Sequence, residues 1–371
     1  MHSHLRLLTL ASSTAITLLL ACQDPGDPTG SSDEIAAAKA GAFAKLIALP
    51  TLSGRTSEAL AVNAAGTVAV GYAWERGTNG TMRAVRWSLQ NDGSWNIAVL
   101  PHAATATGAI ARAVDAQGRG AGNDFPANTS DAVYWPTTGG FNVLSCVGET
   151  GAAGVYGISA DGQSLVGTRT GISPARAAVW RPGSCVQNLP PLAAGAFTAA
   201  RAVNTNGTLI GGSAALTPTG NGFPVRWTRV SGQWQVAQID QRPGPVLGGN
   251  AVGDFVGYVR VVGGTCAQSA GCQRAMIWYA AGGSLQLGTL GGADGWGNDI
   301  NAAREVVGVS TSSAGNTAYI WSQSTGIRRL PSMASCCAVA NSVSDVRQDG
   351  TRVVAGIDLS GTARAVVWVV Q

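Results

Sequence analysis

The sequence predicts an all-β protein, a seven-bladed β-propeller of four-stranded antiparallel blades in which an N-terminal strand closes the last blade. Three recurring features predict this fold: a short strand ending in Trp, a hairpin turn of the form Asn/Asp-x-x-Gly, and an apolar strand that often ends in Leu-Pro. Self-similarity with a period of about 40–50 residues is a signature of stacked or radial repeats.

The Trp strand gives the register of the repeat. Its seven copies use seven of the eleven Trp residues, and the steps between them are 48, 45, 47, 51, 43 and 47 residues. The copies end at Trp87, Trp135, Trp180, Trp227, Trp278, Trp321 and Trp368.

A hairpin turn precedes each Trp strand. Its first side chain can accept a hydrogen bond from the turn backbone, and its Gly takes the left-handed position that closes a bulged hairpin. Two copies depart from the pattern: the sixth has Arg304 in place of the Gly, and the seventh, from Ser344 to Gly350, has three extra residues. The regular copies are Asn63–Gly66, Asp115–Gly118, Ser159–Gly162, Asn204–Gly207 and Asn250–Gly253.

The order of the strands predicts a closed ring. The strand before the turn is expected to be innermost, followed outward by a Gly-led strand, the Trp strand and the Leu-Pro strand. The chain begins with an outermost strand near Leu46 and ends with a Trp strand at Trp368. We therefore expect residues 46–49 to pair with residues 365–368, whereas a linear solenoid would leave the first strand unpaired and would need polar caps.

Composition and net charge narrow the range of protein classes to which the chain could belong. The 371 residues include 51 Gly and only 12% charged residues, against about 25% in a typical domain. Such a chain must cover most of its strand faces, as sheets packed face to face do. The net charge is +4 and no basic run occurs, which argues against nucleic acid as a partner.

The N-terminus reads as a targeting segment. Leu7 to Ala21 is apolar or small, and it is shorter than the roughly 20 residues that span a bilayer. Leu19-Leu20-Ala21-Cys22 resembles a bacterial lipoprotein lipobox, which implies a lipid on Cys22 and cleavage before it; an ordinary signal peptide is the alternative. By the same resemblance, Gln23 favours the outer membrane of a two-membrane cell. We expect residues 1–21 to be the signal peptide, 22–40 a flexible tether, and 41–371 the propeller.

The longest loops are expected between the second and third strands of a unit, at Val261–Gln273 and Ala73–Met82. In a propeller these loops share one face with the connections between units, and that face is the default binding surface. Neutral variation in loop length is the alternative.

The units resemble the HAF family of extracellular repeats. The matching segments are Leu287–Gly292, Ile300-Asn301, Val306–Gly308, and Ala199–Asn204 with Gly207. The His of the family motif is absent; Arg83, Arg176, Arg274 and Arg364 stand in its place, and Asp131 in another copy. The resemblance implies a secreted or surface repeat protein with a propeller-like fold and no established activity.

Candidate catalytic groups are few. His102 is the only His after the predicted signal peptide, and a solvated loop residue is its simplest interpretation. Asp294, Asp299 and Glu75 are the nearest candidates for a carboxylate pair of the kind used in glycoside hydrolysis. The four Arg residues named above could ring the channel and contact an anionic ligand; pairing with neighbouring Asp side chains is the alternative.

Six Cys residues follow Cys22, and an even number in an exported chain predicts disulfides. Cys266 and Cys272 could bridge one loop. Cys336 and Cys337 are adjacent and either bond to each other or pair elsewhere. Cys146 and Cys185 remain as a third pair. The paired CxxC spacing of zinc sites is missing, and no metal or cofactor is predicted.

The function that these features favour is a lipid-anchored, monomeric, non-enzymatic binding module of the cell envelope. Its loop face would bind a protein or a glycan. A propeller hydrolase or lyase acting on polysaccharide is one alternative, and a structural envelope component is another. A pocket with two or three acids and an aromatic side chain would favour the enzyme, and a flat face with scattered polar groups the binding module.

Overall fold

The computed structural model describes residues 43–54, 56–75, 80–126, 129–144, 152–181, 184–263, 266, 271–334 and 336–371. The predicted signal peptide, tether and Cys22 lie outside these residues. The described chain forms 28 β-strands. Within it, no helix has the length and apolar character needed to cross a membrane.

The strands fall into sets of four, taken in chain order. The first three sets comprise β2 (Ser57–Val62), β3 (Val68–Glu75), β4 (Thr81–Leu89) and β5 (Trp95–Val99); β6 (Ala106–Val114), β7 (Gly120–Pro126), β8 (Asp131–Trp135) and β9 (Asn142–Val143); and β10 (Ala153–Ile158), β11 (Leu165–Arg169), β12 (Arg176–Trp180) and β13 (Gln187–Asn188).

The next three sets comprise β14 (Thr198–Val203), β15 (Leu209–Ala215), β16 (Gly222–Val230) and β17 (Gln233–Gln238); β18 (Val246–Gly249), β19 (Phe255–Val261), β20 (Cys272–Trp278) and β21 (Ser284–Gln286); and β22 (Gly295–Ile300), β23 (Val306–Ser312), β24 (Gly315–Ser322) and β25 (Gly326–Arg329). The last set combines β26 (Ala338–Val343), β27 (Arg352–Asp358) and β28 (Arg364–Val370) with β1 (Ala44–Ala48).

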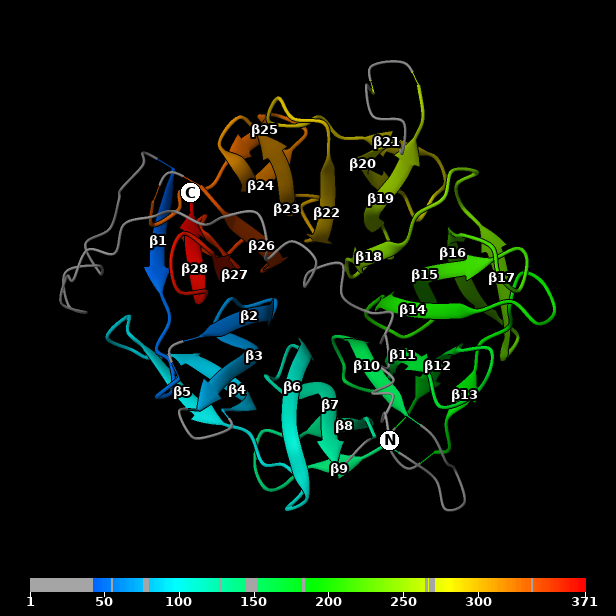
Figure 1. Ribbon diagram of the computed structural model, residues 1–371, viewed down its shortest axis with the longest axis horizontal. Coiled ribbons are helices and arrows are strands. Elements are labelled where there is room, and N and C mark those ends of the chain that lie inside the picture. The colour runs from blue at the N-terminus through cyan, green and yellow to red at the C-terminus, as the bar shows by residue number, and fades with distance from the viewer. Residues whose placement is uncertain are drawn as a thin grey trace, which may run out of the picture.

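The sheets surround a common centre (Figure 1). Five of them have four strands, and one has eight because a single parallel pairing, Met82 with Gly108, joins the β2–β5 set to the β6–β9 set. In each set the first strand lies toward the centre, and the second, third and fourth follow outward (Figure 1).

The two ends of the described chain share one sheet. Strand β1 pairs antiparallel with β28, with Leu46 opposite Trp368 and Ala48 opposite Val366. Just beyond the strand, Leu49 donates its N–H to the carbonyl of Ala365 at 2.9 Å. The predicted pairing of the N-terminal strand with the last Trp strand is therefore confirmed, and the two strands lie side by side in Figure 1.

The Trp side chains mark the core between adjacent sheets. Six of the seven are buried, and Trp321 is half-buried. Four indole N–H groups donate to a Pro carbonyl at the end of the preceding outermost strand. These bonds join Trp87 to Pro50, Trp135 to Pro101, Trp227 to Pro190 and Trp368 to Pro331, at 2.6 to 2.8 Å. The Leu-Pro motif thus supplies an acceptor to the next sheet.

The hairpin turns adopt the predicted conformation. The Gly residues that close them have positive φ angles, from 65° at Gly207 to 90° at Gly253. Arg304, which replaces Gly in the sixth copy, keeps the same left-handed conformation with φ of 61°. Its guanidinium forms an ion pair with Asp254 in the preceding turn at 2.8 Å.

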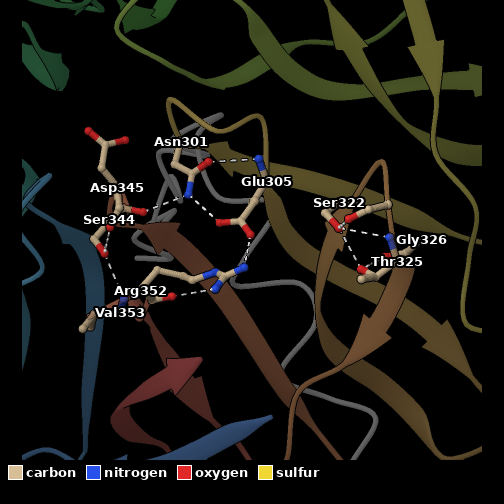
Figure 2. A network of polar contacts seen from close by, with 11 residues as sticks. Asn301, Glu305, Ser322, Thr325, Gly326, Ser344, Asp345, Arg352 and Val353 are labelled. Atoms are coloured by element: carbon tan, nitrogen blue, oxygen red, sulfur yellow. Dashed lines mark hydrogen bonds and ion pairs between the residues drawn. The ribbon is translucent and has the colours of Figure 1, made fainter. Parts of the chain in front are cut away.

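Hydrogen bonds join neighbouring hairpin turns, as Figure 2 shows for two of them. Asn301 accepts a hydrogen bond from the N–H of Glu305 at 2.9 Å, within its own turn. Its amide nitrogen donates to the Ser344 carbonyl of the next turn at 3.0 Å. Arg352 bonds to Glu305 across the same boundary. Because the turns contact one another in this way, they all lie at one end of the ring.

Each innermost strand carries a β-bulge that the adjacent strand accommodates with Gly. In the β14–β17 set the pairing register shifts between Ala200 and Ala202, so Arg201 is the extra residue. A Cβ on Gly212, opposite this bulge, would lie 2.0 Å from the carbonyl oxygen of Ala199. The equivalent Gly residues have the same backbone contact at 1.9 to 2.1 Å: Gly71, Gly122, Gly167, Gly257, Gly308 and Gly356.

The two ends of the ring differ. We call the end with the hairpin turns between first and second strands the turn face. The opposite end is the loop face, where second strands connect to third strands and where each set connects to the next. Since consecutive strands are antiparallel, these two kinds of connection are at opposite ends of every sheet.

Candidate functional site: the central channel

A cavity of about 270 Å³ lies at the centre of the ring. Its walls are the innermost strands and its rim includes the hairpin turns, so it lies toward the turn face. The extra residue of every bulge lines it: Leu60, Arg112, Tyr156, Arg201, Leu247, Asn298 and Asn341. We call these seven side chains the bulge ring.

Three consecutive members of the bulge ring form a cationic arc. The guanidinium carbon of Arg201 lies 3.9 Å from the ring centroid of Tyr156, and that of Arg112 lies 5.1 Å from it. Stacking of guanidinium on an aromatic face is favourable, and more so away from water. Arg112 also donates from Nε to Asn123 at 3.1 Å.

Neither Arg112 nor Arg201 of the cationic arc is in contact with a carboxylate in the described ranges, although the charge of Arg112 acts on Glu58. None of the five ion pairs found in the described ranges includes Arg112 or Arg201. Burial lowers the pKa of the Arg201 guanidinium; Arg112 lowers it further, and Tyr156 opposes the change. A positive charge is therefore held in a site where its hydration is reduced.

Two Asn residues form an amide arc elsewhere in the bulge ring. Asn298 donates to the carbonyl of Ala340 at 2.9 Å. Asn341 donates to the Glu58 carboxylate at 2.9 Å and to the Ala59 carbonyl at 3.0 Å. Each amide thus connects its own sheet to the next one along the chain or around the closure.

Two acids lie beside the amide arc. Burial raises the pKa of Asp299 to about 6, against hydrogen bonds from Ser342, Val343 and Ile300 that favour its charged form. Burial also raises the pKa of Glu58, while Asn341, Tyr72 and Arg112 act in the opposite direction. Of these two acids, Asp299 lines the channel, whereas Glu58 lies behind its wall and interacts with Arg112 of the cationic arc.

The four Arg residues expected beside the channel do not line it. They lie on third strands, two strands away from the centre, at the loop-face end. Arg83 forms an ion pair with Glu75 at 2.9 Å, and Arg176 and Arg274 donate to the carbonyls of Ala196 and Ala293, in the loop that leads to the next set. Arg364 begins β28. The ring of Arg residues beside the channel, one of the two interpretations considered, is therefore not formed, because these residues lie on the third strand from the axis.

Glu75 and His102 meet at Arg83, which contacts both, but the other two candidate acids do not join them. Glu75 belongs to the β2–β5 set, whereas Asp294 and Asp299 belong to the segment of β22. Asp294 accepts a hydrogen bond from the N–H of Gln273 at 2.7 Å. His102 lies between Arg83, at 2.7 Å from Nε2, and the Ala103 carbonyl, at 2.9 Å from Nδ1. Each of these groups is thus held by structural contacts, and Glu75 and His102 share one of them, Arg83.

The described cysteines are bonded. Cys266 bonds to Cys272 in the loop between β19 and β20, and Cys336 bonds to its neighbour Cys337 in the loop before β26. Cys185 is also in a disulfide, and Cys146 lies outside the described residues. Across the described ranges, no group of three His, Cys, Asp or Glu side chains could hold a metal ion.

Similar folds occur among solved structures. The β-propeller domain of the Trilobed protease from Pyrococcus furiosus, which has an open velcro topology, has a TM-score of 0.54 at 10% identity over 85% of this chain and 94% of that chain. The chain is a β-propeller by fold.

Two further propellers are less similar. YCF48 bound to D1 peptide has a TM-score of 0.48 at 13% identity, over 88% of this chain and 96% of that chain. The WD40 β-propeller domain of Doa1 has a TM-score of 0.45 at 15% identity, over 87% and 96%. Neither the protein-family models nor the curated proteins give a match to this sequence.

The bulge ring of the propeller is the feature that sequence reasoning missed. A signal for it exists: every member stands three residues before the first residue of its hairpin turn, as Arg201 stands before Asn204. The position is variable in chemistry, with Arg, Tyr, Leu and Asn, whereas its neighbours are mostly small or apolar. That contrast marks a position outside the core.

Proposed function

We propose that this propeller is a closed ring of seven blades that works as a non-enzymatic interaction module of the cell envelope. Each set of four strands is one blade, and the β1–β28 pairing completes the seventh. Such closure favours a rigid scaffold, and rigid scaffolds commonly carry binding residues on their loops.

The loop face is the proposed binding surface for a protein or glycan partner. The observation that carries this proposal is the position of three exposed apolar side chains. Trp74, Leu216 and Val262 lie where a second strand ends at the loop face, with 37%, 45% and 71% of their surface exposed. Aromatic residues such as Trp are enriched at protein interfaces relative to the rest of the surface.

The two disulfides also favour the loop face as the binding surface. The Cys266–Cys272 bond closes the loop that follows Val262, and the Cys336–Cys337 bond lies in another loop at this end of the ring. A crosslink restricts a loop before binding, so less ordering entropy is lost when a partner binds.

The proposed location is the outside of a bacterial membrane. The lipobox resemblance at Leu19–Cys22 and the HAF-type repeats both favour an exported, lipid-anchored protein. Replacing Cys22 with Ala is expected to move the chain from the membrane fraction to the soluble fraction of lysed cells. Retention of that variant in membranes would contradict lipid anchoring.

The binding proposal is tested with matched triple variants. Trp74, Leu216 and Val262 are changed to Ser on the loop face. Val230, Val252 and Val346, which are similarly exposed at the turn face, are changed to Ser as the control. Binding is measured by biolayer interferometry against purified envelope polysaccharides and envelope proteins. The loop-face variant should lose binding that the control keeps. Loss in the control, or none in the loop-face variant, would contradict the proposal.

A further inference from the structure

The bulge ring divides into arcs of different chemistry. Going around the ring, Leu60 is followed by Arg112, Tyr156 and Arg201, then by Leu247, and then by Asn298 and Asn341. The two Leu side chains therefore separate the cationic arc from the amide arc. Because each side chain comes from the same structural position, the separation reflects residue choice and not differences in backbone.

The cationic arc is built to hold an anion. Two guanidiniums flank one aromatic ring, at 3.9 Å and 5.1 Å, and neither belongs to an ion pair within the part of the chain described. Guanidinium groups present planar donors that match carboxylate and phosphate oxygens. An anion placed there would also relieve the mutual repulsion of Arg112 and Arg201.

The amide arc can hold hydroxyl groups. The amide nitrogens of Asn298 and Asn341 are used in bonds to protein acceptors at 2.9 to 3.0 Å. Their side-chain oxygens accept no hydrogen bond from any residue in the described ranges, so they are available to hydroxyl donors. Asn oxygens of this kind can accept two hydrogen bonds each.

The size of the cavity selects a small ligand. Its volume of about 270 Å³ is slightly below the range of about 300–1,000 Å³ typical of sites for drug-sized molecules. A single compact molecule fits this space better than an oligosaccharide or a peptide. The ligand must therefore carry its anionic group and its hydroxyl groups close together.

We propose that the central channel binds one small hydroxylated anion, a sugar acid or a sugar phosphate. Its carboxylate or phosphate contacts Arg112 and Arg201, and its hydroxyl groups contact Asn298 and Asn341. The site opens toward the turn face, so it is separate from the proposed partner surface on the loop face. Neither proposal depends on the other.

The test uses isothermal titration calorimetry on the purified full-length chain at low ionic strength. The probes are glucuronate, glucose 6-phosphate and, as the uncharged comparison, glucose. At least one anion should bind, and glucose should bind at least tenfold more weakly. Preference for glucuronate or for glucose 6-phosphate distinguishes the two anion classes.

Variants then locate the site. Arg201→Gln and Arg112→Gln should each weaken anion binding at least tenfold. The matched control is Arg328→Gln, because Arg328 stacks on Phe43 at 3.6 Å but does not line the channel; it should leave binding unchanged. Circular dichroism of every variant verifies folding, and if Arg201→Gln does not fold, Arg112→Gln decides. Absence of anion binding, or binding that the channel variants leave unchanged, would overturn the proposal, as would an equal loss in Arg328→Gln.

Discussion

The closure of the ring can be tested by placing one proline at two adjacent positions of β1. Antiparallel pairs alternate between hydrogen-bonded and non-hydrogen-bonded. Leu49 donates to Ala365, so Ile47, two residues earlier and opposite Val367, lies in a hydrogen-bonded pair. Ala48 lies between these pairs, and its N–H points away from β28. Ile47→Pro therefore removes a bond of the closure, whereas Ala48→Pro does not.

The expected magnitudes differ by severalfold. In Ile47→Pro the carbonyl of Val367, which is fully buried, loses its donor, at a cost of about 1–3 kcal/mol. The proline ring would also be directed at β28, so the total loss should reach about 3 kcal/mol. Ala48→Pro affects only the outward side of an edge strand, where proline is tolerated, and should cost about 1 kcal/mol or less.

The assay is equilibrium unfolding in guanidinium chloride, followed by Trp fluorescence. Ile47→Ala is included to measure the loss of the half-buried side chain alone. The midpoint for Ile47→Pro should be clearly lower than for both Ile47→Ala and Ala48→Pro. Equal effects of the two prolines, or equal effects of Pro and Ala at position 47, would refute the hydrogen-bonded closure.

Three further predictions concern the core and the channel. Gly212→Ala should destabilise the fold by about 1–3 kcal/mol, because its Cβ would lie 2.0 Å from a backbone oxygen. Gly361→Ala is the control, because a Cβ there would have no atom within 4 Å, and it should leave the midpoint of the same denaturation assay unchanged. Equal effects of the two substitutions would count against the bulge argument. Trp227→Phe removes the bond to the Pro190 carbonyl at 2.8 Å and should cost about 1–3 kcal/mol in urea unfolding; an unchanged midpoint would argue against that bond. Burial raises the pKa of Asp299 to about 6, above its unfolded value near 4. Between these pH values the folded state therefore binds more protons than the unfolded state. The free energy of unfolding should fall as pH rises from about 4 to 6, by as much as about 3 kcal/mol. Asp299→Asn should remove that part of the slope in urea titrations at pH 4 to 7, and identical slopes would contradict the assignment.

Much of the fold could be predicted because its signals are local and repeated. A turn such as Asn204–Gly207 needs a side-chain acceptor and a left-handed residue, and both are readable from four letters. The Trp register is readable because a large side chain recurs at one position. Closure followed from strand order alone, since a chain that starts on an outermost strand needs a partner for it.

The channel could not be predicted in the same way. A bulge shifts the alternation of inward and outward side chains by one residue, so Arg201 has no orientation that a simple period-two pattern would give. The Arg residues of the third strands were considered for the channel although their strands lie away from the axis. Arg176 and Arg201 look alike in sequence, yet only Arg201 lies on an innermost strand.

The backbone at each bulge is held by a Gly on one side and a hairpin turn on the other, and the extra side chain takes no part in either. The codons of the bulge ring other than those of Asn298 and Asn341, whose amides bond neighbouring sheets, can therefore be randomised together. A library of such variants could then be selected for binding of new ligands in the central channel, while the strands and turns of the propeller stay unchanged.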